Sequence, residues 1–117
     1  MSQASHLIKG QDAEQRALLW LESQGLQLIC RNHRCKQGEI DLIMQDQESL
    51  VFVEVRFRQG LDQALTSIKP AKQRRLIQAA RHYLSNMRDL PPCRFDVIAL
   101  APDQSPQWIK AAFDVGS

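Results

Sequence analysis

The chain has 117 residues, of which 44% are hydrophobic and 24% charged, and its formal net charge is +2. This length predicts one domain over residues 1–117, with residues 1–5 flexible. No run approaches the roughly 18 apolar residues of a membrane-spanning helix, and the first residues lack the apolar centre of a signal peptide. We therefore expect a cytoplasmic protein with no membrane association.

The three cysteines are Cys30, Cys35 and Cys93. An odd number of cysteines in a chain without an export signal argues against a disulfide framework, so we expect free thiols. Cys30, His33 and Cys35 suggest zinc ligands, but a structural zinc site usually shows two close pairs of ligands, and Cys93 has no partner beside it. A zinc site is therefore disfavoured.

A helix is predicted first, over about residues 6–24, because Ala17, Leu18 and Leu21 recur at helical spacing and Gly25 is a natural terminator. Three strands joined by the short turns KQG and DQES follow. The predicted strands cover about residues 26–35, 39–45 and 50–57.

The second half of the chain predicts a helix over about residues 68–87, with Pro70 tolerated in its first turn, after a loop, RQGLDQALTS. CRFDVIAL is a predicted strand, and the type of the closing segment QWIKAAFDV stays open. The order helix, three strands, helix, strand predicts an α/β domain with a sheet of about four or five strands. A parallel crossover around the second helix would make this sheet mixed.

Acidic residues interrupt the second and third predicted strands, in GEIDLI and VFVEVR. A symmetric hairpin, in which residue 46 pairs with residue 49, sets Asp41 opposite Glu54 and Glu39 opposite Arg56. Opposed like charges destabilise a sheet unless a partner compensates them. A hard divalent cation does so, because Mg²⁺ is held by one or two carboxylates with waters and phosphate oxygens. A slip of one residue would separate the two acids onto opposite faces. Alternation also places Ile40, Leu42 and Met44 together on the face opposite Asp41.

A third carboxylate, Glu14, lies on or beside the apolar stripe of the first helix, three and four residues before Ala17 and Leu18. A single acid of this kind is usually a salt-bridged structural group. Three acids converging from a helix and two strands favour a metal site, because unpaired buried charge is costly. Asp96 is either a fourth ligand or a structural group, and the structural role is favoured because buried acids are mostly satisfied by hydrogen bonds.

Positive charge is concentrated around the second predicted helix, since no acidic residue occurs between Asp62 and Asp89. Such a segment can neutralise phosphates and bind nucleic acid independently of sequence, or it can be a solvated helix face. Its basic residues are Lys69, Lys72, Arg74, Arg75, Arg81 and Arg88.

Taken together, GEIDLI, VFVEVRFR, the helix pattern K..RL...A..YL, RFDVIAL and the terminal W-I-K-x-A-F resemble the YraN family of small bacterial proteins, over about residues 10–113. That family is similar to the PD-(D/E)xK nucleases. Their restriction-endonuclease-like fold also includes archaeal Holliday junction resolvases.

The resemblance implies a restriction-endonuclease-like core in which Asp41, Glu54 and Glu14 match the metal-binding acids. It implies one or two Mg²⁺ or Mn²⁺ ions, a bound water as nucleophile and cleavage of a phosphodiester, and it raises a homodimer as a candidate assembly. The motif's usual lysine is replaced here by Arg56, which stays protonated and cannot act as a general base but can hold a phosphate. Lys72 is a candidate replacement.

The leading hypothesis is therefore a divalent-metal-dependent nuclease acting on branched or damaged DNA, with Asp41, Glu54, Arg56 and Glu14 in the catalytic site. One alternative is a non-catalytic nucleic-acid-binding module that keeps the fold, which Arg56 favours. Another is a protein-interaction component whose basic helix meets an acidic partner. The residues assigned to the nucleic-acid backbone are Arg31, Arg34, Lys69, Lys72, Arg74 and Arg75.

Overall fold

The computed structural model describes the backbone of residues 2–66 and 68–113, and the side chains within these ranges from residue 12 onward. Its elements are α1 (Ser2–Ser23), β1 (Gln27–Cys35), β2 (Gly38–Asp46), β3 (Ser49–Phe57), α2 (Leu61–Ala64), α3 (Pro70–Leu84), β4 (Cys93–Leu100) and β5 (Gln107–Phe113). No helix in the described part of the chain is long and apolar enough to cross a membrane.

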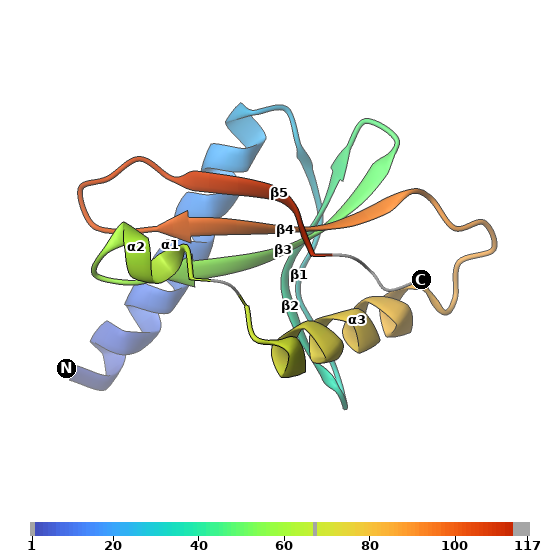
Figure 1. Cartoon of the computed structure of the whole chain (residues 1–117), viewed down its shortest axis with the longest axis horizontal. Helices are drawn as coiled ribbons and strands as arrows, with labels where there is room; N and C mark the ends of the chain where they lie inside the picture. The colour runs from blue at the N-terminus through green and yellow to red at the C-terminus, as the bar shows by residue number, and fades with distance from the viewer. Residues whose placement is uncertain (1, 67, 114–117) are drawn as a thin grey trace.

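The five strands form one sheet in the order β1-β2-β3-β4-β5 (Figure 1). Neighbouring strands are antiparallel except β3 and β4, which are parallel and joined by the crossover through α2 and α3. The predicted mixed α/β sheet is thereby confirmed. Of the closing segment of undecided type, Gln107–Phe113 is the fifth strand, and the last two residues of that segment lie outside the described range. The RQGLDQALTS segment, expected to be a loop, contains the single helical turn α2, which buries Ala64.

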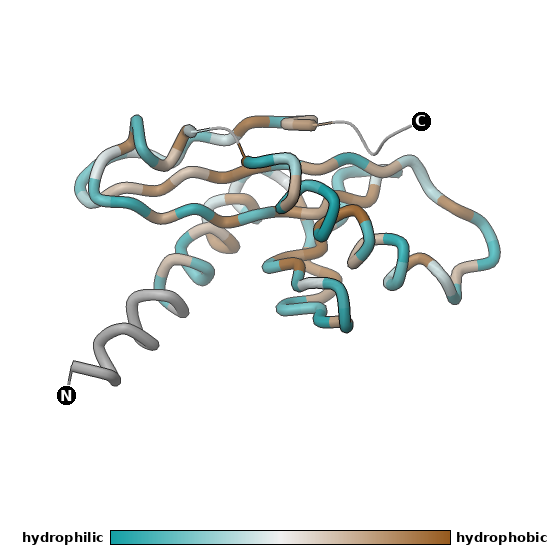
Figure 2. Tube along the Cα trace, turned by 60° about the horizontal axis from the view of Figure 1, so that its bottom comes forward, coloured by the Kyte–Doolittle hydropathy of each residue, from teal (hydrophilic) through white to brown (hydrophobic). Residues whose placement is uncertain are grey.

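The two long helices cover opposite faces of the sheet (Figure 1). Ala17, Leu18 and Leu21 of α1 pack in one apolar cluster, and Leu76 and Ala79 of α3 pack in the other. Figure 2 shows apolar residues concentrated along the central strands, which contribute side chains to both clusters. Burial of these two helix faces is the main source of stability expected for such a sandwich.

The register predicted for the hairpin of β2 and β3 is confirmed, since the pairs run from Asp46 with Ser49 to Leu42 with Val53. The predicted face of Ile40 is wrong, because Ile40 belongs to the α3 cluster whereas Leu42 belongs to the α1 cluster. Strict alternation fails because the ribbon of β1 and β2 is irregular: Asn32, between the partners of Ile40 and Leu42, has φ 53°.

Gly38, at the start of β2, marks where this ribbon reaches α3. A Cβ atom on Gly38 would lie 3.1 Å from the backbone oxygen of Arg75 and 3.4 Å from its Cβ. The absence of a side chain therefore lets the strand approach the helix backbone directly.

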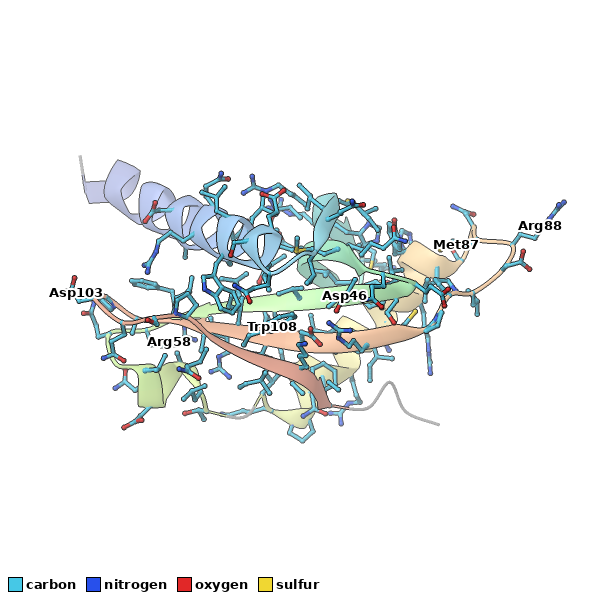
Figure 3. The ribbon with its side chains drawn as sticks, turned by 90° about the horizontal axis from the view of Figure 1, so that it is seen from above. Asp46, Arg58, Met87, Arg88, Asp103 and Trp108 are labelled. Carbon is cyan, nitrogen blue, oxygen red and sulfur yellow. The ribbon has the colours of Figure 1, made fainter. Side chains whose placement is uncertain are left out.

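Asp96 of β4 is fully buried and accepts hydrogen bonds from three residues. Arg94 Nε donates to both carboxylate oxygens at 3.0 and 3.1 Å, Trp108 Nε1 donates at 2.9 Å, and the Ala111 N–H donates at 2.9 Å. Arg94 also pairs with Asp46 at 2.9 Å, so the network joins β4, β5 and the end of β2 (Figure 3). These bonds support the structural role predicted for Asp96 rather than a ligand role.

Replacing Gly38 by valine should destabilise the protein by about 1–3 kcal/mol, because the added carbons press on the α3 backbone. Thermal unfolding should show a clear fall in Tm. The matched control is Gly60→Val, since no atom lies within 4 Å of a Cβ at Gly60 and its φ of −117° suits valine. Equal Tm values for the two variants would contradict the close approach.

Asp96→Asn should cost about 3–5 kcal/mol, since it removes one partner of a buried ion pair and places an amide N–H₂ against donors. Urea unfolding monitored by Trp fluorescence measures the loss. Asp103→Asn, at an exposed turn residue whose φ of 58° asparagine tolerates, should leave the midpoint unchanged. A midpoint for Asp96→Asn equal to that of the control would show that the network contributes little.

Candidate functional site

The site begins where β2 separates from β3. Their regular pairing ends at Leu42 and Val53, and the N–H of Val55 donates instead to Asp41 Oδ2 at 2.9 Å. Beyond this point β3 continues alongside β4 alone, as far as Phe57 with Leu100. The Asp41 carboxylate therefore takes the place of a backbone acceptor at the fork between the two strands.

Glu54 lies beside Asp41 at this fork, close enough for the Asp41 carboxyl to affect its protonation. The Glu54 side chain is 11% exposed. Burial raises the pKa of Glu54 to about 8, the neighbouring Asp41 carboxyl acts in the same direction, and Lys72 acts against them. The predicted proximity of the two acids is confirmed.

One oxygen of this pair lacks an aligned hydrogen bond. Glu54 Oε2 is buried and accepts no hydrogen bond, although Lys72 Nζ lies 3.3 Å away as an ion-pair partner. The ammonium provides charge but not hydrogen-bond geometry. A buried acceptor without a hydrogen-bond donor indicates a further partner, such as an ion or a water.

Glu14 approaches the fork from α1. Burial raises the pKa of Glu14 above its ordinary value, and the charge of Asp41 adds to this effect, while Arg31, 4.0 Å away, opposes it. With its amide nitrogen turned toward the acids, Asn32 donates to Glu14 at 3.1 Å and to Glu39 at 3.2 Å. The predicted convergence of three carboxylates from one helix and two strands therefore occurs as a close pair with a third acid nearby.

Among the side chains that the structure describes, no three acidic, imidazole or thiol groups lie close enough together to hold one metal ion. Glu14 is therefore suited to a water of a metal bound at Asp41 and Glu54 rather than to direct ligation. The free cysteines likewise form no such group with His33, which instead contacts His82, with ring nitrogens 3.1 Å apart.

The predicted pairing of Glu39 with Arg56 is wrong. Glu39 pairs with Arg34 at 3.3 Å, and Arg56 Nη1 donates to the backbone oxygen of Thr66, ahead of α3. The physical reason is the fork: β2 has left β3 before Arg56, so no residue of β2 lies opposite it.

A cleft of about 430 Å³ opens beside Glu54, between β3, the connection from α2 and the start of α3. Five of its lining residues are cations, and Glu54 is the acid among them. The cations are Arg56, Arg58, Lys69, Lys72 and Arg75. A strongly positive cleft with one carboxyl group in its wall is suited to a phosphate, and the neighbouring Asp41, outside the lining, is the nearest second carboxylate for a divalent cation.

The start of α3 contributes to this positive potential. Lys69 is the N-cap residue of α3, but its side chain makes no capping hydrogen bond. The first turn of α3 contains no acidic residue. Basic side chains here oppose the helix dipole, whereas an anion would be stabilised by it. The local sequence is therefore unfavourable for the helix alone and favourable for a bound anion.

The residues predicted to bind a nucleic-acid backbone lie in different parts of the structure, and some of them are paired with acids. Lys69, Lys72 and Arg75 lie together in the cleft, and Arg74 is exposed elsewhere on α3. Arg31 and Arg34, on β1, are paired with the acids Glu14 and Glu39.

Arg58 lines the cleft but is absent from the sequence prediction. Its signal was available, since Arg58 follows the last residue of β3 and is two residues from Arg56, which lines the same cleft. Arg58 lies at the end of the sheet where β3 enters the crossover (Figure 3).

The model of the uncharacterised protein family UPF0102 matches residues 13–100, from within α1 to the end of β4. The chain belongs to this family. The UPF0102 protein of Cupriavidus taiwanensis is 54% identical over 113 residues, covering 94% of this chain and 86% of that protein. The UPF0102 proteins of Nitrosomonas eutropha and Nitrosococcus oceani are 52% and 48% identical, covering 92% and 100% of this chain and 95% and 100% of those proteins. The YraN resemblance is thus confirmed as UPF0102 membership.

The raised pKa of Glu54 predicts a pH-dependent stability. The folded state holds this proton more tightly than the unfolded chain, whose value is near 4.5, so the contribution is complete below about pH 4.5 and is lost as pH rises through about 8. Glu54→Gln cannot ionise and should gain stability relative to the parent between pH 5 and pH 9, on the order of 2–4 kcal/mol.

Urea unfolding of the parent and Glu54→Gln across this range measures the difference. Glu22→Gln, at an exposed position of α1, should run parallel to the parent and serves as the control. Parallel curves for Glu54→Gln and the parent would contradict a raised pKa of the buried Glu54.

Proposed function

We propose that this protein is a divalent-metal-dependent nuclease that hydrolyses phosphodiester bonds in DNA, including branched or damaged DNA. The observation that carries the proposal is the pair of neighbouring carboxyl groups, Asp41 and Glu54, at the fork, where Glu54 lines a cleft with five cations. The resemblance of GEIDLI and VFVEVR to the PD-(D/E)xK nucleases supports the same reading.

The residues at the fork fit a hard divalent cation. Asp41 and Glu54 offer carboxylate oxygens, the ligands that Mg²⁺ and Mn²⁺ prefer, and Glu54 Oε2 accepts no hydrogen bond. These two residues would hold the ion, and Glu14 would accept a hydrogen bond from one of its waters. When bound, such an ion supplies a more acidic water and neutralises charge on the attacked phosphate.

Binding of the substrate phosphates would fall to the cations of the cleft. Lys69, Arg75 and Arg58 would bind the phosphates on either side of the cleaved bond, since guanidinium and ammonium groups recognise phosphate oxygens by charge and hydrogen bonding. Arg56 stays protonated and cannot accept a proton. Its bond to the Thr66 carbonyl ties β3 to the crossover and so shapes the wall of the cleft.

The test is cleavage of linear, flapped and four-way DNA by purified protein with Mn²⁺ or Mg²⁺. Asp41→Asn should reduce the rate by about a thousandfold or more, as expected when a metal ligand is removed, while its amide oxygen still accepts the Val55 N–H. Asp103→Asn, in the turn before β5, should cleave like the parent. No cleavage of any substrate by the parent, or equal rates for Asp41→Asn, would refute the proposal.

The second candidate is a nucleic-acid-binding module without turnover. It is favoured by the engagement of Arg56 with a backbone carbonyl and by the Lys72 ion pair, which neutralises part of the Glu54 charge. Salt-sensitive DNA binding that survives in an Asp41→Asn/Glu54→Gln double variant, in a parent that never cleaves, would select this function.

A further inference from the structure

Lys72 connects the two halves of the site. Its Nζ lies 3.3 Å from Glu54 Oε2, the same buried oxygen that accepts no hydrogen bond. The lysine side chain is 46% exposed and lines the cleft, whereas Glu54 is 11% exposed. The ammonium of Lys72 therefore contacts Glu54, while the lysine side chain as a whole is partly exposed in the cleft.

Among the described residues, Lys72 is the one cation paired with Glu54. The ion pairs of the described side chains place no other cation on Asp41 or Glu54, and Arg56 donates to the Thr66 carbonyl. Arg31 contacts Glu14, on the α1 side of the fork.

The position of Lys72 also has a local cost. It is the third residue of α3, in a first turn without any acid, where a positive charge opposes the helix dipole. The charge of Lys72 is instead paired with Glu54 of β3, so this ion pair forms only in the folded domain.

We propose that Lys72 is a displaceable counter-ion of the metal site. In the metal-free protein its ammonium lies against Glu54 Oε2, and when a divalent cation and a substrate phosphate are bound it moves from Glu54 to the phosphate. This inference rests on the proposed function, which it deepens by naming the group that couples metal binding to substrate binding.

The physical basis is competition for one oxygen. An ammonium 3.3 Å from Glu54 Oε2 would repel a divalent ion bound to the same oxygen, so it weakens the binding of that ion. A phosphate in the cleft offers the ammonium a second anion within reach of its four-carbon stem. Metal and nucleic acid should therefore bind with positive coupling, each raising the affinity for the other by the same factor.

Lys72→Met tests this role, since it keeps the stem and removes the charge. Mn²⁺ titration followed by electron paramagnetic resonance, without nucleic acid, should show affinity about tenfold tighter than in the parent. Binding of a single-stranded oligonucleotide in Ca²⁺ should weaken, and its dependence on the metal should largely disappear. Lys72→Arg should restore the parent values in part.

Lys69→Met is the matched control, because Lys69 lines the same cleft but no ion pair joins it to Glu54. It should weaken oligonucleotide binding and leave Mn²⁺ affinity within about twofold of the parent. A purely structural role for Lys72 would lower thermal stability without tightening Mn²⁺ binding.

The outcomes separate this inference from the proposed function. Mn²⁺ binding that requires Asp41 but is unchanged or weaker in Lys72→Met overturns the counter-ion role and leaves the nuclease proposal intact. Tighter Mn²⁺ binding in Lys72→Met, in a parent that cleaves no DNA, supports the counter-ion and refutes the nuclease. Mn²⁺ binding that is equal in the parent and Asp41→Asn removes the metal site, and both proposals fail.

Discussion

The hydrogen bond from the Val55 N–H to the Asp41 carboxylate holds the fork between β2 and β3. On one side of the fork the strands are paired and buried; on the other, β2 turns toward α3, where Gly38 meets the backbone of Arg75. The divergence removes a backbone acceptor from Val55, and a side chain replaces it. The cleft opens beside this fork, between the end of β3 and the start of α3, which the crossover brings together.

Two acidic sites in this domain show how surroundings decide the use of a carboxylate. Asp96 is fully buried, and every bond it makes comes from a fixed donor on β4 or β5. Glu54 is also largely buried, but it faces a second carboxyl and leaves one oxygen without a hydrogen bond. The first arrangement fastens strands together. The second holds a carboxyl group beside another acid and an ammonium, at a cost in stability that grows as pH rises.

The distribution of charge in the cleft matters more than the total for the whole chain. A formal net charge of +2 predicts little about binding partners, yet five cations line one cleft around a single acid. They come from the end of β3 and the first turns of α3, which the crossover brings together. Such a local field favours phosphate binding even though Arg31 and Arg34, on β1, are engaged with acids.

The sequence alone determined the features that depend on neighbouring residues. The register of β2 with β3, and with it the meeting of Asp41 and Glu54, follows from a short turn and a period of two, both local properties. The helical spacing of α1 likewise directed Glu14 toward the sheet. Only the tertiary structure decided where β2 leaves β3, why Glu39 misses Arg56, and that Lys72 reaches Glu54 across the crossover. These outcomes depend on strand twist and on packing between elements distant in the chain, and no residue pattern within one element encodes them.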